Sequence, residues 1–474
     1  MSETRVSTPH KQTFIESFRV YLKPIMLAML VLGFASGLPL MMVFSKLSTW
    51  LREVGVDRTT IGGMYAVSLA YSLKMFWAPL VDKMKVPILG DILGQRRSWM
   101  VVAITGTVVG LITIATSNPE VSLTQTVIGA LILAFSGATL DISVDAWRIE
   151  SAPNDEQANM AAVYNLGYRF AIMFAGYGIA IAGLTSWLIA YGIMAMAMLL
   201  IMVAVIFFIS EPEHEVDETS DDLNFIQRFG KSVATPFRQI ATRFGPWVLV
   251  VLAIVALYRI SDFTMGVMAS PFYIDLGYST ETIGLIQGTF GPWPIVVGGF
   301  LGGFVAVRYS LLPALLAGGI ITILTNGAFA LLALAAGPGL DAHANGDLSA
   351  IVNTPSSMAL LGVIVADNLA AGFVGSVFIA YMSAMVDRKF AATQYAVLSS
   401  TYSIFCKMVA STTSGPLSEA IGWAGFFSVT ALYTIVPMLL IIVVMMFGPK
   451  AAKGKLEEEP EEPEEPVPET QPAS

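Results

Sequence analysis

Apolar residues dominate this chain in runs of about 20 residues, the length of helix that crosses a bilayer core about 30 Å thick. These runs recur from Tyr21 to Phe447 and are separated by short polar segments. The pattern predicts an all-α polytopic membrane protein with twelve transmembrane helices, at 21–48, 60–82, 98–117, 121–149, 159–184, 187–209, 245–274, 281–306, 310–337, 352–385, 391–419 and 422–447.

A polar segment between the sixth and seventh runs divides the chain into two halves. We expect a cytoplasmic N-terminus (1–20), a six-helix bundle (21–209), a cytoplasmic linker (210–244), a second six-helix bundle (245–447) and a tail (448–474). The tail is acidic, rich in proline and poor in apolar residues, a composition typical of disordered segments.

The distribution of basic residues predicts the orientation of the chain. Of the 26 lysines and arginines, nineteen fall on the side that holds both termini. Only Arg52 and Arg58 lie in loops on the other side, and five lie within spans. By the positive-inside rule both termini are cytoplasmic. Composition agrees with a membrane protein, since charged residues make up only 13% of the chain and mean hydropathy is +0.69.

The two halves resemble each other in sequence. W-L-R-E-V-G-V-D-R-T-T-I-G follows the first run and Y-I-D-L-G-Y-S-T-E-T-I-G follows the seventh, so that Gly62 matches Gly284. A second match joins the segments that begin at Gln157 and Gln394. Repeats six helices apart share one orientation in the membrane, as the halves of major-facilitator transporters do. The expected fold is therefore two six-helix bundles around a central cavity.

The loop between spans 2 and 3 carries a charge pattern that resembles the loop signature of major-facilitator transporters. Its charged members are Asp82, Lys83, Arg96 and Arg97, with an insertion between the two pairs. A basic loop that only sets topology is the alternative, but an acid at the end of span 2 favours the signature. We assign these four residues to gating.

Six further stretches resemble the AmpG muropeptide permease family. They are G-F-A-S-G-L-P at 33–39, Y-S-L-K-M-F-W-A-P-L-V-D at 71–82, D-I-S-V-D-A-W-R-I-E at 141–150, Y-N-L-G-Y-R at 164–169, D-N-L-A-A-G-F at 367–373 and F-A-A-T-Q-Y-A-V-L-S-S at 390–400. The resemblance implies import of N-acetylglucosaminyl-1,6-anhydro-N-acetylmuramyl peptides across the bacterial inner membrane for peptidoglycan recycling, driven by proton symport. The same branch includes siderophore and acetyl-CoA permeases, which are the alternative. Lys407 departs from the family pattern.

Ionisable groups within spans are costly and normally face the protein interior or water. On span 4, Asp145 and Arg148 are neighbours on one helix face, and Asp141 lies one turn deeper. We expect Asp82, Asp145 and Arg148 to form a gating cluster that ties spans 2 and 4 together and closes the cytoplasmic side. Asp141 is either part of that structural cluster or a proton-coupling site.

Two other acids within spans are candidates for proton coupling. Asp262 lies three residues after Arg259 on span 7, so the pair is either a neutralising structural contact or a switch that frees the arginine when the acid is protonated. Asp367 on span 10 has no cation nearby in the sequence.

A sugar–peptide substrate needs hydrogen-bonding groups and cations for its carboxylates. Polar residues within spans supply them, although packing between helices is the commoner role of such residues. The candidates are Lys46, Tyr71, Lys74, Asn165, Tyr168, Arg169, Arg259, Asn368, Gln394, Tyr395, Ser399, Tyr402 and Lys407.

Other classes of function lack support in the sequence. No catalytic set, soluble output domain or nucleotide-binding loop is recognisable, and the three histidines have no metal-ligand spacing. We expect a transporter and not an enzyme, with no cofactor or metal and the proton gradient as its energy source. Its partners would be an amphiphilic sugar–peptide and membrane lipid, with no nucleic acid, and the protein would be a monomer.

Overall fold

The computed structural model describes residues 23–151, 156–212, 238, 242–347, 349–386 and 391–453. The predicted N-terminus (1–20) lies outside these ranges, as do most of the linker and the tail. Within them the chain is helical, and ten helical stretches are long and apolar enough to cross a membrane. The all-α membrane fold is confirmed, whereas the count of twelve spans stays a prediction.

The first bundle contains long helices and also segments that are divided into short helical pieces. Its elements are α2 (Pro24–Met41), the π-helical turn η2 (Met42–Lys46), α3 (Leu47–Glu53), α4 (Arg58–Met64), η3 (Tyr65–Ser68), α5 (Leu69–Leu73), η4 (Lys74–Phe76), α6 (Ala78–Lys83), α7 (Leu89–Leu93), α8 (Gln95–Ala115), α9 (Thr124–Ser151), α10 (Gln157–Leu184) and α11 (Trp187–Phe207).

The second bundle follows the same order of long helices. Its elements are η5 (Gly245–Trp247), α13 (Val248–Leu257), α14 (Ile260–Asp275), α15 (Thr280–Phe290), α16 (Pro292–Tyr309), α17 (Leu311–Ala335), α18 (Gly339–Ala344), α19 (Ser357–Met385), α20 (Ala391–Tyr433), α21 (Ile435–Phe447) and η7 (Ala451–Lys453).

Two segments differ from the continuous helices that hydropathy predicts. The second predicted span is five short pieces, because 3-10 turns at η3 and η4 interrupt the α-helical hydrogen bonding. The eleventh predicted span and the first part of the twelfth form one helical stretch, α20, which is broken at Gly422, whose φ of 70° is open mainly to glycine. The rest of the twelfth span is α21, which begins after Thr434.

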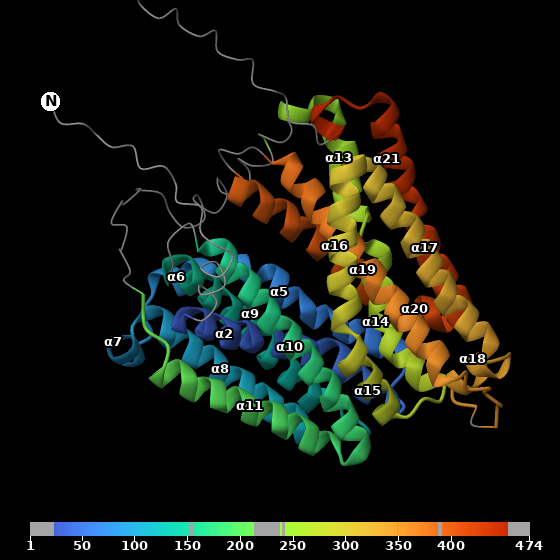
Figure 1. Ribbon diagram of the computed structural model, residues 1–474. Coiled ribbons are helices and arrows are strands. Elements are labelled where there is room, and N and C mark those ends of the chain that lie inside the picture. Colours follow the sequence, from blue (N-terminus) through green and yellow to red (C-terminus); the bar gives the residue numbers. More distant parts are fainter. Residues whose placement is uncertain are drawn as a thin grey trace, which may run out of the picture.

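The two bundles touch at one end and diverge at the other (Figure 1). We call the end where α3 finishes the Glu53 end, and the end where α2 begins the Pro24 end. Near the Glu53 end α15 packs on α10 and α4 packs on α20, so that helices of opposite bundles are in contact there. Toward the Pro24 end α6 and α13 lie far apart (Figure 1).

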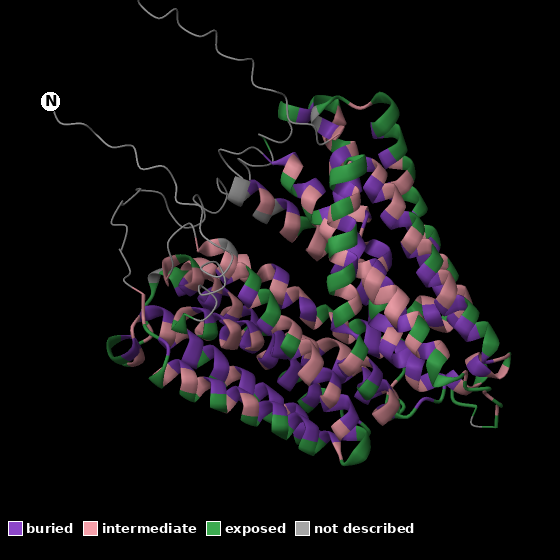
Figure 2. Cartoon of the chain, in the orientation of Figure 1, coloured by how far each residue is buried: buried purple, intermediate pink, exposed green. Residues whose placement is uncertain are grey.

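Many large apolar residues of both bundles are exposed, and Figure 2 shows exposed positions along the outer helices. Leu200, Val307 and Leu324, for example, are 65%, 90% and 66% exposed. An apolar surface of this extent suits contact with lipid and not with water. Exposed apolar residues of this kind are therefore those expected to face the bilayer.

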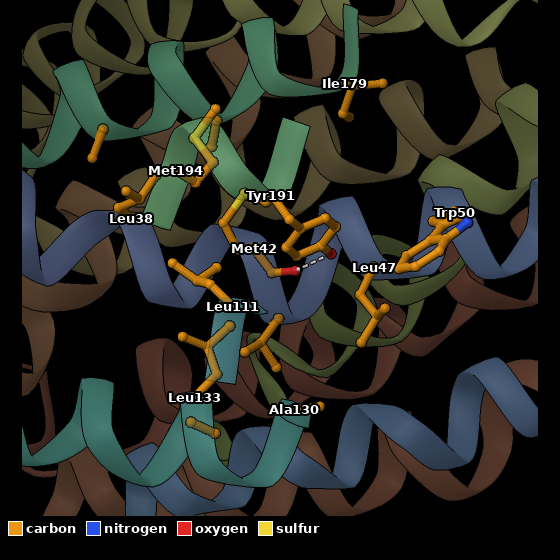
Figure 3. Close-up of a cluster of buried hydrophobic side chains, with 14 of the residues drawn as sticks. Leu38, Met42, Leu47, Trp50, Leu111, Ala130, Leu133, Ile179, Tyr191 and Met194 are labelled. Atoms are coloured by element: carbon orange, nitrogen blue, oxygen red, sulfur yellow. Dashed lines mark hydrogen bonds between the residues drawn. The ribbon is translucent and has the colours of Figure 1, made fainter. Parts of the chain in front are cut away.

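Small and large apolar residues fill the interior of the first bundle (Figure 3). Leu38, Leu111 and Leu133 are fully buried, and Tyr191 donates a hydrogen bond of 3.1 Å to the Met42 carbonyl. That carbonyl belongs to the π-helical turn, so the tyrosine satisfies a backbone acceptor where the helical pattern is disturbed.

The sequence repeat corresponds to a structural repeat. Gly55 and Gly277 both end a helix at φ 84°, and Asp57 and Ser279 cap the next helices by accepting backbone N–H bonds. The positive φ explains why glycine stands at both positions. The two halves therefore turn in the same way at the Glu53 end.

Candidate substrate cavity and its gates

A cavity of about 420 Å³ lies between the two bundles. The first bundle supplies residues from α2 through η3, and the second supplies residues from α14 and α20. Most of the lining is apolar, and its polar members are Ser45, Ser48, Tyr65, Arg259, Asp262, Ser403 and Lys407. A few polar groups in an apolar cavity are typical of sites for amphiphilic molecules.

The second bundle contributes a charged group to this cavity. The Arg259 Nε and Asp262 Oδ2 atoms lie 2.9 Å apart, and the two side chains are 21% and 20% exposed. Arg259 stands at the break between α13 and α14, and Asp262 lies in the first turn of α14. The helix N-terminus favours a carboxylate there. The structure thus brings together the pair that their spacing predicts.

Asp367 and Asn368 of α19 are half-buried. The charge of Asp367 interacts with those of Asp262 and Arg259, so these three residues form one charged group. Tyr402 of α20 packs edge-on against Phe263, with ring centroids 6.5 Å apart. The predicted residues Asp262, Asp367 and Tyr402 therefore come from three different helices, α14, α19 and α20.

Lys407 joins the two bundles. Its Nζ donates to Ser72 Oγ at 2.9 Å and to the Ser68 carbonyl at 3.1 Å, and both acceptors belong to the broken second span. Ser72 also contacts Ser403 of α20 at 2.8 Å. The lysine thus lines the cavity and also holds α20 against α5.

The other predicted members of the polar stripe on α20 lie nearer its first residue. Gln394 is buried, and Tyr395 and Ser399 are half-buried.

The first bundle contributes a second charged group. Lys74 Nζ lies 3.6 Å from Asp141 Oδ2, with the aspartate 16% exposed. The sequence predicted no cation near Asp141, because Lys74 is 67 positions away in the chain and reaches it only through the packing of η4 on α9. Tyr71 lies over Gly137 of α9, where a Cβ would stand 2.1 Å from the tyrosine oxygen.

The predicted residues of α10 differ in how far they are exposed. Asn165 is exposed and donates to its own helix at Ala161, 2.9 Å away. Tyr168 and Arg169 are half-buried, and Tyr168 packs on Tyr164 with ring centroids 6.3 Å apart.

The cluster at the Pro24 end differs from the predicted one. Asp82 pairs with Arg96 of α8 at 2.8 Å, and Arg96 also pairs with Glu150 at 2.5 Å. Asp145 and Arg148 form a separate, longer contact of 4.0 Å. The cluster ties α6, α8 and α9 together within the first bundle, so in this conformation it does not close one bundle against the other.

Two features of this cluster were missed from the sequence. Glu150 is its second acid, and Glu211, just after α11, accepts the backbone N–H groups of Arg96 and Arg97 at 2.7 and 3.0 Å. An acid beside the first turn of α8 satisfies donors that no carbonyl of the helix reaches. Lys83 belongs to α6, but its side chain lies outside the described parts.

Charged contacts cross between the bundles at the Glu53 end. Arg52 donates from Nε and Nη2 to the two oxygens of Asp275 at 2.5 and 3.0 Å, and both side chains are more than nine-tenths buried. Arg58 donates to Asn345 at 2.6 Å, and Glu419 accepts from Thr59 Oγ1 at 2.7 Å. We call the Arg52–Asp275 pair and these two contacts the latch.

The latch has an internal symmetry that follows the repeat. Glu53 accepts the indole N–H of Trp187 at 2.6 Å, and Asp275 accepts that of Trp423 at 3.0 Å. Trp187 begins α11, and Trp423 directly follows the break at Gly422 within α20. Each acid also reaches the other half, Asp275 to Arg52 and Glu53 to the Thr280 hydroxyl at 2.6 Å. The sequence predicts Arg52 only as a charged residue of a loop, whereas the structure places it in α3.

Two helical bundles that enclose a cavity and seal it at one end define a major-facilitator transporter. The model of the Major Facilitator Superfamily matches residues 25–343. Among solved structures, a bacterial homolog of the human lysosomal transporter Spinster has a TM-score of 0.67 at 12% identity, covering 93% of this chain and 99% of that one. A D-xylose–proton symporter has a TM-score of 0.62 at 14% identity over 92% and 99%.

Within this superfamily the chain belongs to the AmpG family. It is 34% identical to the AmpG 4 protein of Rickettsia conorii over 420 residues, 88% of this chain and 94% of the relative. It is 28% identical to the anhydromuropeptide permease of Escherichia coli K12 over 430 residues, 90% of this chain and 80% of the relative. The protein is a transporter and not an enzyme, as the sequence predicted.

Proposed function

We propose that this transporter imports anhydromuropeptides through the inner membrane for peptidoglycan recycling, and that proton symport drives the import. The observation that carries the proposal is the amphiphilic cavity, which has one charged group from each bundle beside it. A muropeptide presents sugar hydroxyls, peptide carboxylates and an apolar anhydro ring. The permease of Escherichia coli takes its name from such a substrate.

The positions of the cations support a carboxylated substrate. Lys74 and Arg259 are each paired with an acid, at 3.6 and 2.9 Å. A substrate carboxylate can replace either acid as the partner, provided that the acid takes up a proton. Binding of the anion and of the proton would then depend on each other, as symport requires.

Asp262 is our first candidate for the acid that carries the proton, and Asp367 beside it is the second. Both share Arg259, so protonation of one leaves the other as the counter-charge. Asp141 stands in the same relation to Lys74 in the first bundle. In each case a neutral acid would free a cation toward the space between the bundles.

The basic-residue distribution places the Pro24 end and both termini in the cytoplasm. The latch then lies on the periplasmic side, and the divergence of the bundles makes this an inward-facing conformation (Figure 1). Opening of the latch would expose the cavity to the periplasm. The protein would work as a monomer surrounded by lipid, because one chain supplies both sides of the cavity.

Uptake of a labelled anhydromuropeptide into proteoliposomes, with and without a proton gradient, tests the proposal. We expect accumulation only with the gradient. Asp262→Asn should abolish accumulation while leaving exchange across the membrane, because the neutral residue binds no proton. Asp91→Asn is the matched control, since Asp91 is an exposed acid of the short helix α7. Absence of uptake by the wild-type protein would refute the proposal.

A further inference from the structure

Lys46 is buried at the surface where the two bundles meet, with 4% of the residue exposed. Its Nζ donates to Gln287 Oε1 of the opposite bundle at 2.8 Å and to Ser45 Oγ at 3.4 Å. Ser45 in turn contacts Ser270 of the second bundle at 3.2 Å. Every partner is neutral, which sets Lys46 apart from Lys74 and Arg259.

No acid within the described residues lies within 4 Å of the Lys46 amine. The elements around the amine are α3, α9, α10, α11, α14, α15 and η3. The titratable or charged residues of these elements are Arg52, Glu53, Tyr65, Asp141, Asp145, Arg148, Glu150, Tyr164, Tyr168, Arg169, Tyr177, Tyr191, Asp262, Tyr273, Asp275 and Glu281. The acids nearest along α14 are Asp275, which Arg52 neutralises, and Asp262, which Arg259 neutralises.

The local backbone explains how the lysine reaches this place. Residues Met42–Lys46 form a π-helical turn, which widens the helix and rotates its last residues toward the second bundle. π-Helical turns of this kind are frequent at functional sites. Tyr191 fixes the turn by its hydrogen bond to Met42 (Figure 3). The side chain of Lys46 is thus held where α15 covers it.

An ammonium that is removed from water and has only neutral partners is strongly disfavoured relative to the neutral amine. Separation of the bundles at the Glu53 end would take Gln287 away and admit water, and the same amine would then bind a proton readily. The protonation state of Lys46 is therefore tied to the position of the two bundles. Lys74 and Arg259 keep their acids and lack this dependence.

From this geometry we infer that Lys46 carries a proton from the periplasmic side to the cavity. The inference rests on the proposed function in taking the proton gradient as the driving force. With the latch open, the Lys46 nitrogen takes a proton from water. When the bundles close, its N–H bond breaks and the proton passes by way of the Ser45 hydroxyl to water in the cavity, which Ser45 lines. One proton passes through Lys46 in each cycle.

This role predicts that acid shifts the conformational equilibrium. A single linked proton changes the ratio of open to closed molecules by at most about tenfold per pH unit. Spin labels at Val121→Cys and Ile351→Cys report that ratio. Both positions are exposed at the Glu53 end, one in each bundle, and Cys406→Ala removes the native thiol.

We expect the distance between the labels to lengthen as the buffer changes from mildly alkaline to mildly acidic. Lys46→Met should remove most of this pH dependence, and Lys46→Arg should favour the long distance throughout, because the guanidinium stays charged. Lys46→Gln, which keeps a hydrogen-bonding group, is the second neutral variant if Lys46→Met does not fold. Asp91→Asn, which changes an exposed acid of α7, should keep the pH dependence.

Two outcomes would overturn the inference. One is a wild-type distance that does not change with pH, and the other is an unaltered pH dependence in both neutral variants. A purely substrate-binding role would instead let Lys46→Arg transport normally. Since the distance measurement uses no substrate, failure of muropeptide uptake would refute the proposed function and leave this result standing.

Discussion

The Arg52–Asp275 pair should hold the transporter closed at the Glu53 end. Two hydrogen bonds of 2.5 and 3.0 Å join the side chains across the bundles, and the side chains are 8% and 5% exposed. Asp275→Asn removes the negative charge and nearly keeps the shape. In the closed conformation Arg52 is then a buried cation without a counter-charge, whereas in an open conformation water would solvate it.

The size of the effect follows from burial. Loss of one partner of a buried ion pair costs about 3–5 kcal/mol, and Arg52 keeps hydrogen bonds to the carbonyls of Val56 and Ala344. We therefore take about 2–3 kcal/mol as the change in the free energy of closing. At 1.4 kcal/mol for each factor of ten, the ratio of open to closed molecules should rise by about 30- to 150-fold.

The labelled pair Val121→Cys and Ile351→Cys measures this ratio as the fraction of long distances at fixed pH. Asp57→Asn is the matched control, because Asp57 lies at the same end and accepts a hydrogen bond from its own helix at Thr60. In the charge-reversed protein, Arg52→Asp with Asp275→Arg, part of the closed population should return. A distribution that Asp275→Asn leaves unchanged would show that the latch does not set the equilibrium.

Three further predictions concern folding stability. Glu150→Gln should lower the free energy of unfolding by about 1.5–3 kcal/mol, because Arg96 loses a charged partner; an unchanged melting temperature in detergent would contradict this. Gly422→Ala should reduce the yield of folded protein, since alanine strains the backbone at φ 70° and its Cβ would stand 2.3 Å from Asp341; normal yield would contradict it. Asp57→Ala should cost about 1 kcal/mol at neutral pH through loss of the helix cap. Partial burial disfavours the charged carboxylate of Asp57, but hydrogen bonds within the cap outweigh burial and lower its pKa. The cap therefore stabilises the folded protein fully above the pKa of the unfolded state. The difference in stability between the variant and the wild type should vanish as pH falls through the folded pKa.

Local contacts could be predicted where the partners are close in sequence. The Arg259–Asp262 pair follows from helical spacing alone, because residues three apart share a face. The glycine turns at Gly55 and Gly277 follow from the repeat. In these cases the backbone conformation itself brings the residues together.

Contacts between distant segments could not be predicted in the same way. Spacing on span 4 suggested that Asp145 and Arg148 would join Asp82, but Asp82 pairs with Arg96, which also pairs with Glu150. The choice of partner depends on how α6 and α8 each pack against α9. The sequence contains several acids that could pair with a given arginine, and it does not indicate which of them does.

Hydropathy, charge asymmetry and the repeat determined the class of protein, because each depends on composition along one helix and not on how helices pack. Tertiary structure alone decided which charges meet. In the folded protein Asp141 pairs with Lys74, and Arg52 pairs with Asp275 of the other bundle. Lys46 lies among neutral groups. The physical reason is that the cost of a charge depends on its surroundings, and for these residues the surroundings come from helices far away in the chain.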